Sequence, residues 1–179
     1  MQIPTEVKMT SVITKTTLES NAYDNVISFL DDRSIVTDPR DPAGYQKRTF
    51  IYDTDPLAKG VNFGEFPYII AEFPMLEYSN TSTDGKTKEI AWKMNITVRT
   101  SRNGSSQGTT GVGKKDMFTI CDSLQVLFNT LTYRQQFADL RMFFMKLTKL
   151  GVDSITSNQE YIYESSYELT FLERIQVSD

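Results

Sequence analysis

The stretch of sequence most suggestive of chemistry is a glycine-rich segment that ends in two lysines. Residues 108–115 read GTTGVGKK and match the phosphate-binding pattern G-x-x-x-x-G-K-[ST] except at its last position. In such a loop, backbone amides hold the phosphates, the lysine reaches the terminal phosphates, and the final hydroxyl helps to bind Mg²⁺. Lys114 fits this pattern, but Lys115 places a second positive charge where the hydroxyl belongs. We therefore expect a flexible loop over 103–115 and keep a degenerate nucleotide-binding loop as an alternative.

A second candidate is a row of acidic side chains near the end of the chain. Glu160, Glu164 and Glu168 follow one another at intervals of four residues, in a segment where apolar and polar residues alternate. Residues four apart on a strand are separated by about 13 Å. The two carboxylates of a glycosidase lie roughly 5 to 9.5 Å apart. These glutamates therefore indicate a charged strand face and do not form a hydrolytic pair.

The residue types that are missing from the chain exclude several classes of catalytic and metal site. The chain has 179 residues, with no histidine and one cysteine. Catalysis by Ser-His-Asp or Cys-His, imidazole metal ligands, disulfides within the chain and cysteine zinc sites are thereby excluded. The net charge of −4 argues against a dedicated DNA-binding protein. We expect a protein that is not an enzyme and that needs no cofactor or metal.

The spacing of apolar residues predicts the elements that carry these side chains. Apolar residues recur at helical spacing over 11–32 and over 116–131, so we expect helices there. The stripe of the second helix consists of Met117, Ile120, Cys121, Leu124, Leu127, Phe128 and Leu131. Alternation of apolar and polar residues, with a turn at Asp84-Gly85, predicts two hairpins. Their strands are expected at 68–70, 89–102, 142–154 and 160–173, while 133–142 fits either a helix or a loop.

This order of elements predicts an α+β fold in a single domain over 1–179. We expect an antiparallel or mixed β-sheet with two helices packed on one face. A long irregular loop insertion over 33–65 follows the first helix, and 48–52 can form a short strand within it. The strand at 89–102 should turn one face to the core and leave the other, with Lys93 and Arg99, in water. Without an apolar leader or a long apolar span, we expect a soluble protein with no membrane partner.

Charge is divided unevenly between the two predicted hairpins. The first is rich in Lys and Arg along its second strand, and the second carries its acids on the strand at 160–173. Complementary charges of this kind can set the register between identical subunits. The candidate interface residues are Glu160, Glu164, Glu168, Lys93, Arg99, Arg102, Lys114 and Lys115. We expect a protein that assembles with copies of itself.

The order of these elements resembles that of the tail-terminator proteins of long-tailed bacteriophages, of the lambda minor tail protein U type. The segments that carry the resemblance are the amphipathic first helix, EFPYII at 65–70, the strand through Ile90–Val98, the glycine-rich loop, the helix at 116–131 and ELTFLE at 168–173. The insertion at 33–65 is longer than is usual in that family.

The resemblance implies a structural virion protein that forms a ring, typically a hexamer, on the finished tail tube. Such a ring ends tube polymerisation and joins the tail to the head. It implies as partners further copies of the chain, the tail tube protein, a head-side neck or connector protein and the genomic DNA that passes through the lumen. It places the protein in the tail or neck of the virion, after synthesis in the host cytoplasm. If Glu160, Glu164 and Glu168 line the lumen, they repel the DNA backbone and let it slide. Another neck or head-completion connector protein is the alternative.

Overall fold

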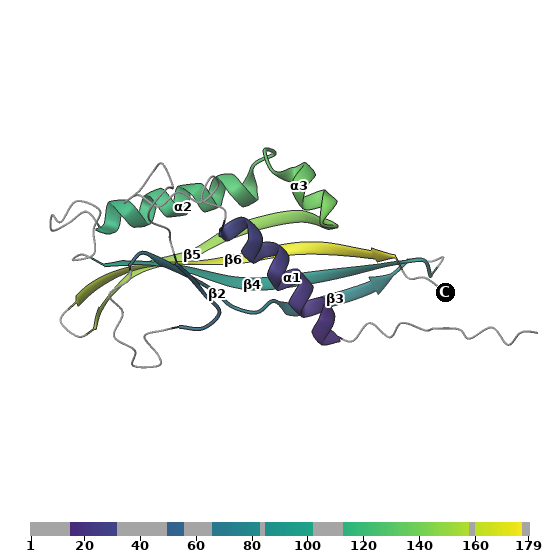
Figure 1. Cartoon of the computed structure of the whole chain (residues 1–179), viewed down its shortest axis with the longest axis horizontal. Helices are drawn as coiled ribbons and strands as arrows, with labels where there is room; N and C mark the ends of the chain where they lie inside the picture. Colours follow the sequence, from purple (N-terminus) through teal and green to yellow (C-terminus); the bar gives the residue numbers. More distant parts are fainter. Residues whose placement is uncertain are drawn as a thin grey trace, which may run out of the picture.

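The chain folds into a long twisted sheet with helices packed along it (Figure 1). This computed structural model describes residues 15–31, 50–55, 66–82, 85–101, 113–157 and 160–176. Among these residues the sheet has six strands, and three helices accompany it. The α+β class expected from the sequence is confirmed.

Three long antiparallel strands form most of the sheet. They are β4 (Thr87–Ser101), β6 (Glu160–Gln176) and β5 (Met142–Ser157); β6 lies between the other two, and β5 lies at the edge of the sheet. Each alternates apolar and polar residues over much of its length, which is the pattern that gives a strand two unlike faces. The predicted pairing of 142–154 with 160–173 is confirmed, although both strands are longer than expected.

Three short strands extend the sheet beyond β4. They are β1 (Phe50–Tyr52), β2 (Tyr68–Ala71) and β3 (Met75–Thr81). β6 occupies one edge of β4, so β2 and β3 share the other: β2 pairs with residues 96–99 and β3 with residues 88–93. β1 is parallel to β2, which makes the sheet mixed. The strand order is therefore β1-β2-β4-β6-β5 at one end of the molecule and β3-β4-β6-β5 at the other.

The first hairpin differs from the expected one in its first strand. The turn forms as predicted: Gly85 has a φ of +71°, and its N–H donates to the carbonyl of Ser82 at 2.9 Å. Glycine adopts this left-handed conformation without steric cost. The strand that directly precedes the turn is β3, and not the strand at 68–70 that we expected to pair across it. A tight turn needs its partner strand immediately before it, and residues 75–81 meet that need.

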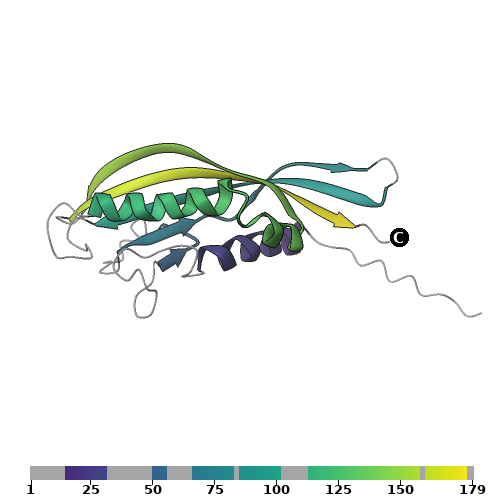
Figure 2. The same cartoon turned by 90° about the horizontal axis from the view of Figure 1, so that it is seen from above.

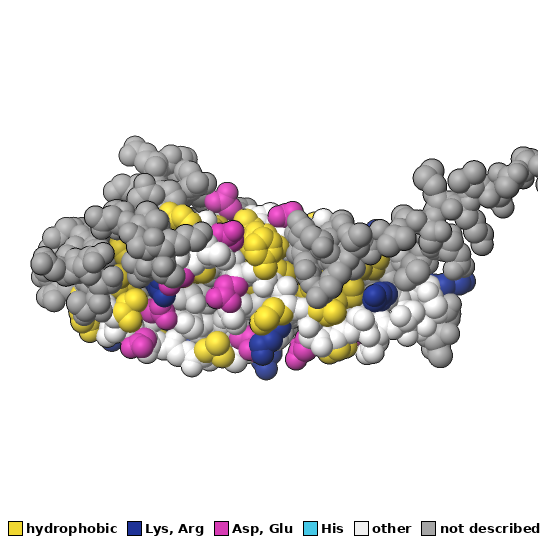
Figure 3. Space-filling view, turned by 90° about the horizontal axis from the view of Figure 1, so that it is seen from below, with side chains coloured by type: hydrophobic (Ala, Val, Ile, Leu, Met, Phe, Trp, Pro, Cys, Tyr) yellow, Lys and Arg dark blue, Asp and Glu magenta, His cyan; other side chains and the backbone are white. Residues whose placement is uncertain are grey.

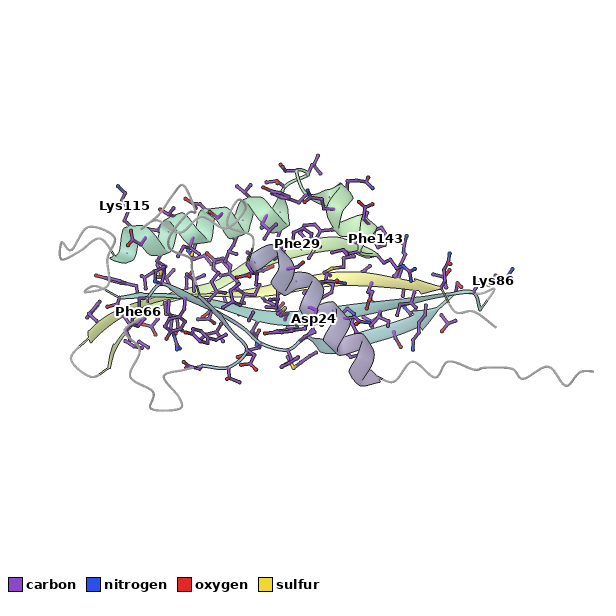
Figure 4. The ribbon with its side chains drawn as sticks, in the orientation of Figure 1. Asp24, Phe29, Phe66, Lys86, Lys115 and Phe143 are labelled. Atoms are coloured by element: carbon purple, nitrogen blue, oxygen red, sulfur yellow. The ribbon has the colours of Figure 1, made fainter. Side chains whose placement is uncertain are left out.

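The helices cover one face of the sheet (Figure 2). They are α1 (Lys15–Leu30), α2 (Gly113–Asn129) and the short α3 (Arg134–Asp139). The predicted stripe of α1 is confirmed at Ala22, Val26, Phe29 and Leu30, all of which are buried. In Figure 4, Phe29 lies between α1 and α3, and its ring is 4.4 Å from that of Phe137. The segment 133–142, left open above, thus contains a helix held by an aromatic contact.

The core lies between these helices and the inner face of β4 and β6. The alternating residues of β4 that were predicted to point inwards are at most 2% exposed; they are Ile90, Trp92, Met94, Ile96 and Val98. From β6, Tyr167, Leu169 and Phe171 join the same cluster. The predicted stripe of α2 is buried against it from Met117 to Phe128. The prediction is wrong for one residue of that stripe: Leu131 is 68% exposed, because the helix ends at Asn129.

The outer face of the sheet was expected to lie in water, but part of it is covered. At the end near β1 and β2, a second cluster of buried residues covers it, formed by Phe66, Tyr68, Ile70 and Ile162. Tyr52 and Ile155 pack against this cluster. As a consequence Arg99 of β4, predicted to be solvated, is buried. Exposure of this face to water is found in part at Lys93, Asn95 and Thr97, which are partly exposed.

The two predicted loops are described only in part. Within 33–65, the structure describes residues 50–55 and confirms a strand at Phe50–Tyr52, and the rest of the insertion lies outside the described residues. Of the glycine-rich loop at 103–115, residues 103–112 lie outside them as well. Gly113 begins α2, so Lys114 and Lys115 belong to the first turn of a helix and not to a flexible loop.

Candidate assembly surface

The opposite charges expected to join two copies are paired within one copy. The register of β4 and β6 places Arg99 opposite Glu164, and Asn95 opposite Glu168. Arg99 Nε donates to Glu164 Oε2 at 2.6 Å, and Lys93 Nζ lies 2.6 Å from Glu168 Oε2. The complementarity of the two strands therefore holds the subunit's own sheet together. These four charges already have partners within one copy, and the expectation that charged residues set the register between copies stays a prediction.

Arg99 is the centre of a buried network on the outer face. Its guanidinium also donates to the carboxylate of Asp55, just after β1, and lies 3.5 Å from the hydroxyl of Tyr68. Burial by itself lowers the pKa of Arg99, but its bonds with Tyr68, Asp55 and Glu164 raise that pKa above its ordinary value. Burial also raises the pKa of the Tyr68 hydroxyl. The network joins the described end of the 33–65 insertion to β4 and β6.

The predicted acidic row is weaker in charge than the sequence indicates. The side chains of Glu164 and Glu168 are 21% and 25% exposed, and each is paired with a cation. The side chain of Glu160 lies outside the described residues. On the face seen from below, the described part of the chain shows acidic, basic and hydrophobic side chains interspersed (Figure 3). A lumen lined by this row stays a prediction, with two of its three charges compensated.

The two lysines of the glycine-rich motif lie at the outer end of α2. Lys115 is exposed and points away from the sheet (Figure 4), and Lys114 Nζ is 5.9 Å from the centre of the Phe118 ring. Thr100 Oγ1 donates to the carbonyl of Gly113 at 2.5 Å and so joins the end of β4 to the start of α2. Arg102 lies outside the described residues.

The start of α2 also bears on the nucleotide-binding alternative. Asp116 is 4% exposed in the first turn of α2, directly after the two lysines of the motif. A carboxylate at this position already complements the positive end of the helix dipole, and it repels an incoming anion. The position of Asp116 therefore argues against a phosphate site at this helix end.

The features that sequence reasoning missed are two apolar edges of the sheet. Every residue of β3 is exposed, including Met75, Leu76 and Tyr78. At the opposite edge, β5 exposes Phe144, Leu150 and Val152. Phe144 lies in β5 at a positive φ of 54° and is 74% exposed. The hairpin turn at Gly85 was the signal that could have located β3.

A hollow of about 340 Å³ adjoins the start of β5, between α3 and the end of α2. Its walls include Phe128, Phe137, Met142 and Phe144, and Arg134 is the one charged residue among those that line it. Such a lining can receive an apolar side chain. It has no pair of acid and base groups and no activated nucleophile, so it does not provide a catalytic site.

Other chemistry is limited in the part of the chain that the structure describes. There, no group of three or more His, Cys, Asp or Glu residues could hold a metal ion. None of the described helices is long and apolar enough to cross a membrane. The thiol of Cys121 is buried, and this burial raises its pKa, so little reactive thiolate forms at neutral pH.

Comparison with known proteins identifies no relative. No family model matches the sequence, and no curated protein matches it significantly.

Proposed function

We propose that this protein is a structural subunit of a phage tail, and that copies of it form a ring that caps the tail tube and joins it to the head-side neck. The observation that carries the proposal is the pair of exposed apolar edges, β3 and β5, at opposite sides of one sheet. A ring needs two different surfaces on each subunit, because each copy contacts its two neighbours in different ways. The two edges meet this requirement.

The chemistry of the chain supports a structural function in preference to catalysis. The sequence has no histidine, and the hollow beside β5 lacks the groups that acid–base or nucleophilic catalysis needs. On the outer face of the sheet, ionised side chains pair with one another, as Lys93–Glu168 and Arg174–Glu89 illustrate. The tail tube, the neck protein and the passing genome enter the proposal through the sequence resemblance.

The proposal is tested first on the purified protein. One chain has a mass of 20.5 kDa, so a hexamer has a mass of about 123 kDa in light scattering and is visible as a ring by electron microscopy. A protein that stays monomeric at every concentration contradicts the proposal. Titration with ATP serves as the control for the nucleotide-binding alternative, and saturable binding or hydrolysis would favour that alternative.

A phage that lacks the protein then separates two kinds of ring. A terminator is required to stop tube growth and to join the tail, so its loss gives overlong or unjoined tails. Normal tails beside leaky, empty heads indicate a head-completion connector instead. Complementation with the gene in trans is the control for effects on neighbouring genes.

A further inference from the structure

We propose that neighbouring copies join by strand addition: β3 of one copy pairs antiparallel with the C-terminal half of β5 of the next copy. The sheet then continues across the contact between subunits. The inference rests on the proposed ring and goes further, because it names the two surfaces that form each contact and the direction in which they pair.

The first surface is the outer edge of β3. All seven residues of this strand are exposed, and Met75 and Tyr78 are 55% and 45% exposed. Among the described residues, β3 pairs with β4 and no other strand. Proteins commonly protect such an edge with proline, charged side chains or a β-bulge. In β3, Glu77 lies at an irregularity in the register between Leu76 and Tyr78, whereas residues 78–81 contain no proline, charge or bulge. This second part of the edge is available for strand pairing.

The second surface is the C-terminal half of β5. The N-terminal half is closed, because outward backbone groups of its edge already have a hydrogen-bond partner. The side chain of Asn129 donates to the carbonyl of Leu147 at 2.9 Å and accepts from its N–H at 2.7 Å, as a neighbouring strand would. Beyond this point the described contact on the β5 edge is local: Ser154 N–H donates to the carboxylate of Asp153 at 2.7 Å. Leu150 and Val152 are 59% and 45% exposed in this open half.

The topology gives the direction of pairing. β3 is antiparallel to β4, β4 to β6, and β6 to β5, so β3 and β5 run in opposite directions. A neighbour produced by rotation about an axis along the strands keeps these directions. Its β3 therefore meets β5 of the first copy in the antiparallel sense, which is the more stable pairing per residue.

The positions of the two surfaces also stagger the copies. β3 lies level with residues 88–93 of β4, whereas the open half of β5 lies level with residues 97–100. The offset is roughly eight residues, or about 26 Å along the strands. If the strands lay exactly parallel to the rotation axis, this offset would give an open helical array. A closed ring with this contact therefore requires strands that are tilted relative to the ring axis, as they are in a β-barrel.

Charge disfavours pairing between two β3 edges. The segment 71–81 carries Glu72 and Glu77 and has no lysine or arginine. Two β3 edges would bring glutamates together, and like charges across a strand pair are destabilising. On β5, Lys146 and Lys149 lie in the closed half and Asp153 lies in the open half. The contact between β3 and β5 therefore depends on the open edges and on the directions of the two strands, and not on attraction between charges.

Cysteine cross-linking tests the contact in the whole protein. Ser79→Cys is combined with Leu150→Cys, Val152→Cys or Ser154→Cys in turn, and each double variant is oxidised with copper phenanthroline. Native Cys121 is 3% exposed and does not compete. At least one pair should give a ladder of covalent oligomers on a non-reducing denaturing gel. The matched control pairs Ser79→Cys with Gln136→Cys, an exposed position on α3 beside the closed half of β5, and should give no ladder.

Proline substitution tests the backbone side of the contact. Ser82 N–H donates to Thr87 C=O, so the alternation of an antiparallel pair places the N–H of Ser79 on the outer edge and that of Asn80 towards β4. Ser79→Pro should weaken assembly at least tenfold while the melting temperature of the subunit stays near that of the wild type. Asn80→Pro should lower the melting temperature, because it removes a hydrogen bond inside the subunit.

The outcomes separate this inference from the proposed function. Rings without a ladder for any of the three pairs overturn the edge contact and leave the ring standing. Dimers formed by Ser79→Cys alone indicate pairing between two β3 edges and also overturn it. A ladder together with normal tails in the deletion phage supports the contact and contradicts the terminator function. A wild-type chain that stays monomeric overturns both.

Discussion

Replacement of Arg99 by methionine offers the most direct test of the buried charge network. Arg99→Met keeps much of the side-chain volume and removes the cation that Asp55 and Glu164 share. Burying a charge is tolerable when its partners remain, but removing one partner leaves a carboxylate in a partly dehydrated site. We therefore expect a large loss of stability without a change of fold.

The magnitude follows from how much of the network is removed from water. The side chain of Arg99 is 10% exposed, while those of Asp55 and Glu164 are 34% and 21% exposed. Breaking a fully buried ion pair costs about 3–5 kcal/mol. Because both carboxylates keep some contact with water, which screens their charge, we expect a loss of about 2–4 kcal/mol. Urea slopes of roughly 2 kcal/mol per molar turn this loss into a midpoint lower by about 1–2 M.

Urea unfolding followed by tryptophan fluorescence measures the effect, since Trp92 lies in the core. Lys93→Met is the matched control, because Lys93 pairs with Glu168 across the same two strands but has a side chain that is 38% exposed. We expect this control to lose no more than about 1 kcal/mol. In the double variant Arg99→Met/Glu164→Gln, part of the loss should be recovered, because one carboxylate is then neutral.

Equal losses in Arg99→Met and Lys93→Met would refute this reasoning, because burial would then have no energetic consequence. So would a double variant that is less stable than Arg99→Met alone. In that case the loss would come from packing and not from charge. Unchanged slopes of the urea transition are the check that the unfolded states are comparable.

Two further predictions concern the core. Glu173 lies on the buried face of β6 and accepts a hydrogen bond from Trp92 Nε1 at 2.9 Å, and burial raises its pKa despite this bond and nearby Arg141. A carboxyl whose pKa is raised by folding lowers the stability once the pH rises above its ordinary pKa of about 4.3. Glu173→Gln should therefore be more stable than the wild type at pH 7 and should lose that advantage below pH 4. An advantage that does not change with pH in urea titrations would contradict this prediction. Leu124 is 0% exposed, so Leu124→Ala should lower the free energy of unfolding by about 2–5 kcal/mol. Val126 is 48% exposed on the same helix, so Val126→Ala should lower it by less than about 0.5 kcal/mol. Similar urea midpoints for the two variants would show that α2 does not pack as described.

The sequence by itself determined the main helices and the long strands, and which side of α2 and of β4 faces the core. The period of apolar residues in α2 and the alternation in β4 both lie within one element, and the faces they predict are buried as expected. The left-handed turn at Gly85 is equally local, since it depends on one residue without a Cβ. These features were predictable because the residues that encode them are neighbours in the chain.

Tertiary structure alone decided which elements lie side by side. Arg99 is buried because Phe66, Tyr68 and Ile162 come from distant parts of the chain to cover its face of the sheet. The basic strand β4 and the acidic strand β6 pair within one subunit, whereas their charges had been expected to meet between copies. The exposure of β3 depends in the same way on which strands lie beyond it. Periodicity describes one element at a time, whereas burial, ion pairing and open edges depend on contacts between elements far apart in the chain.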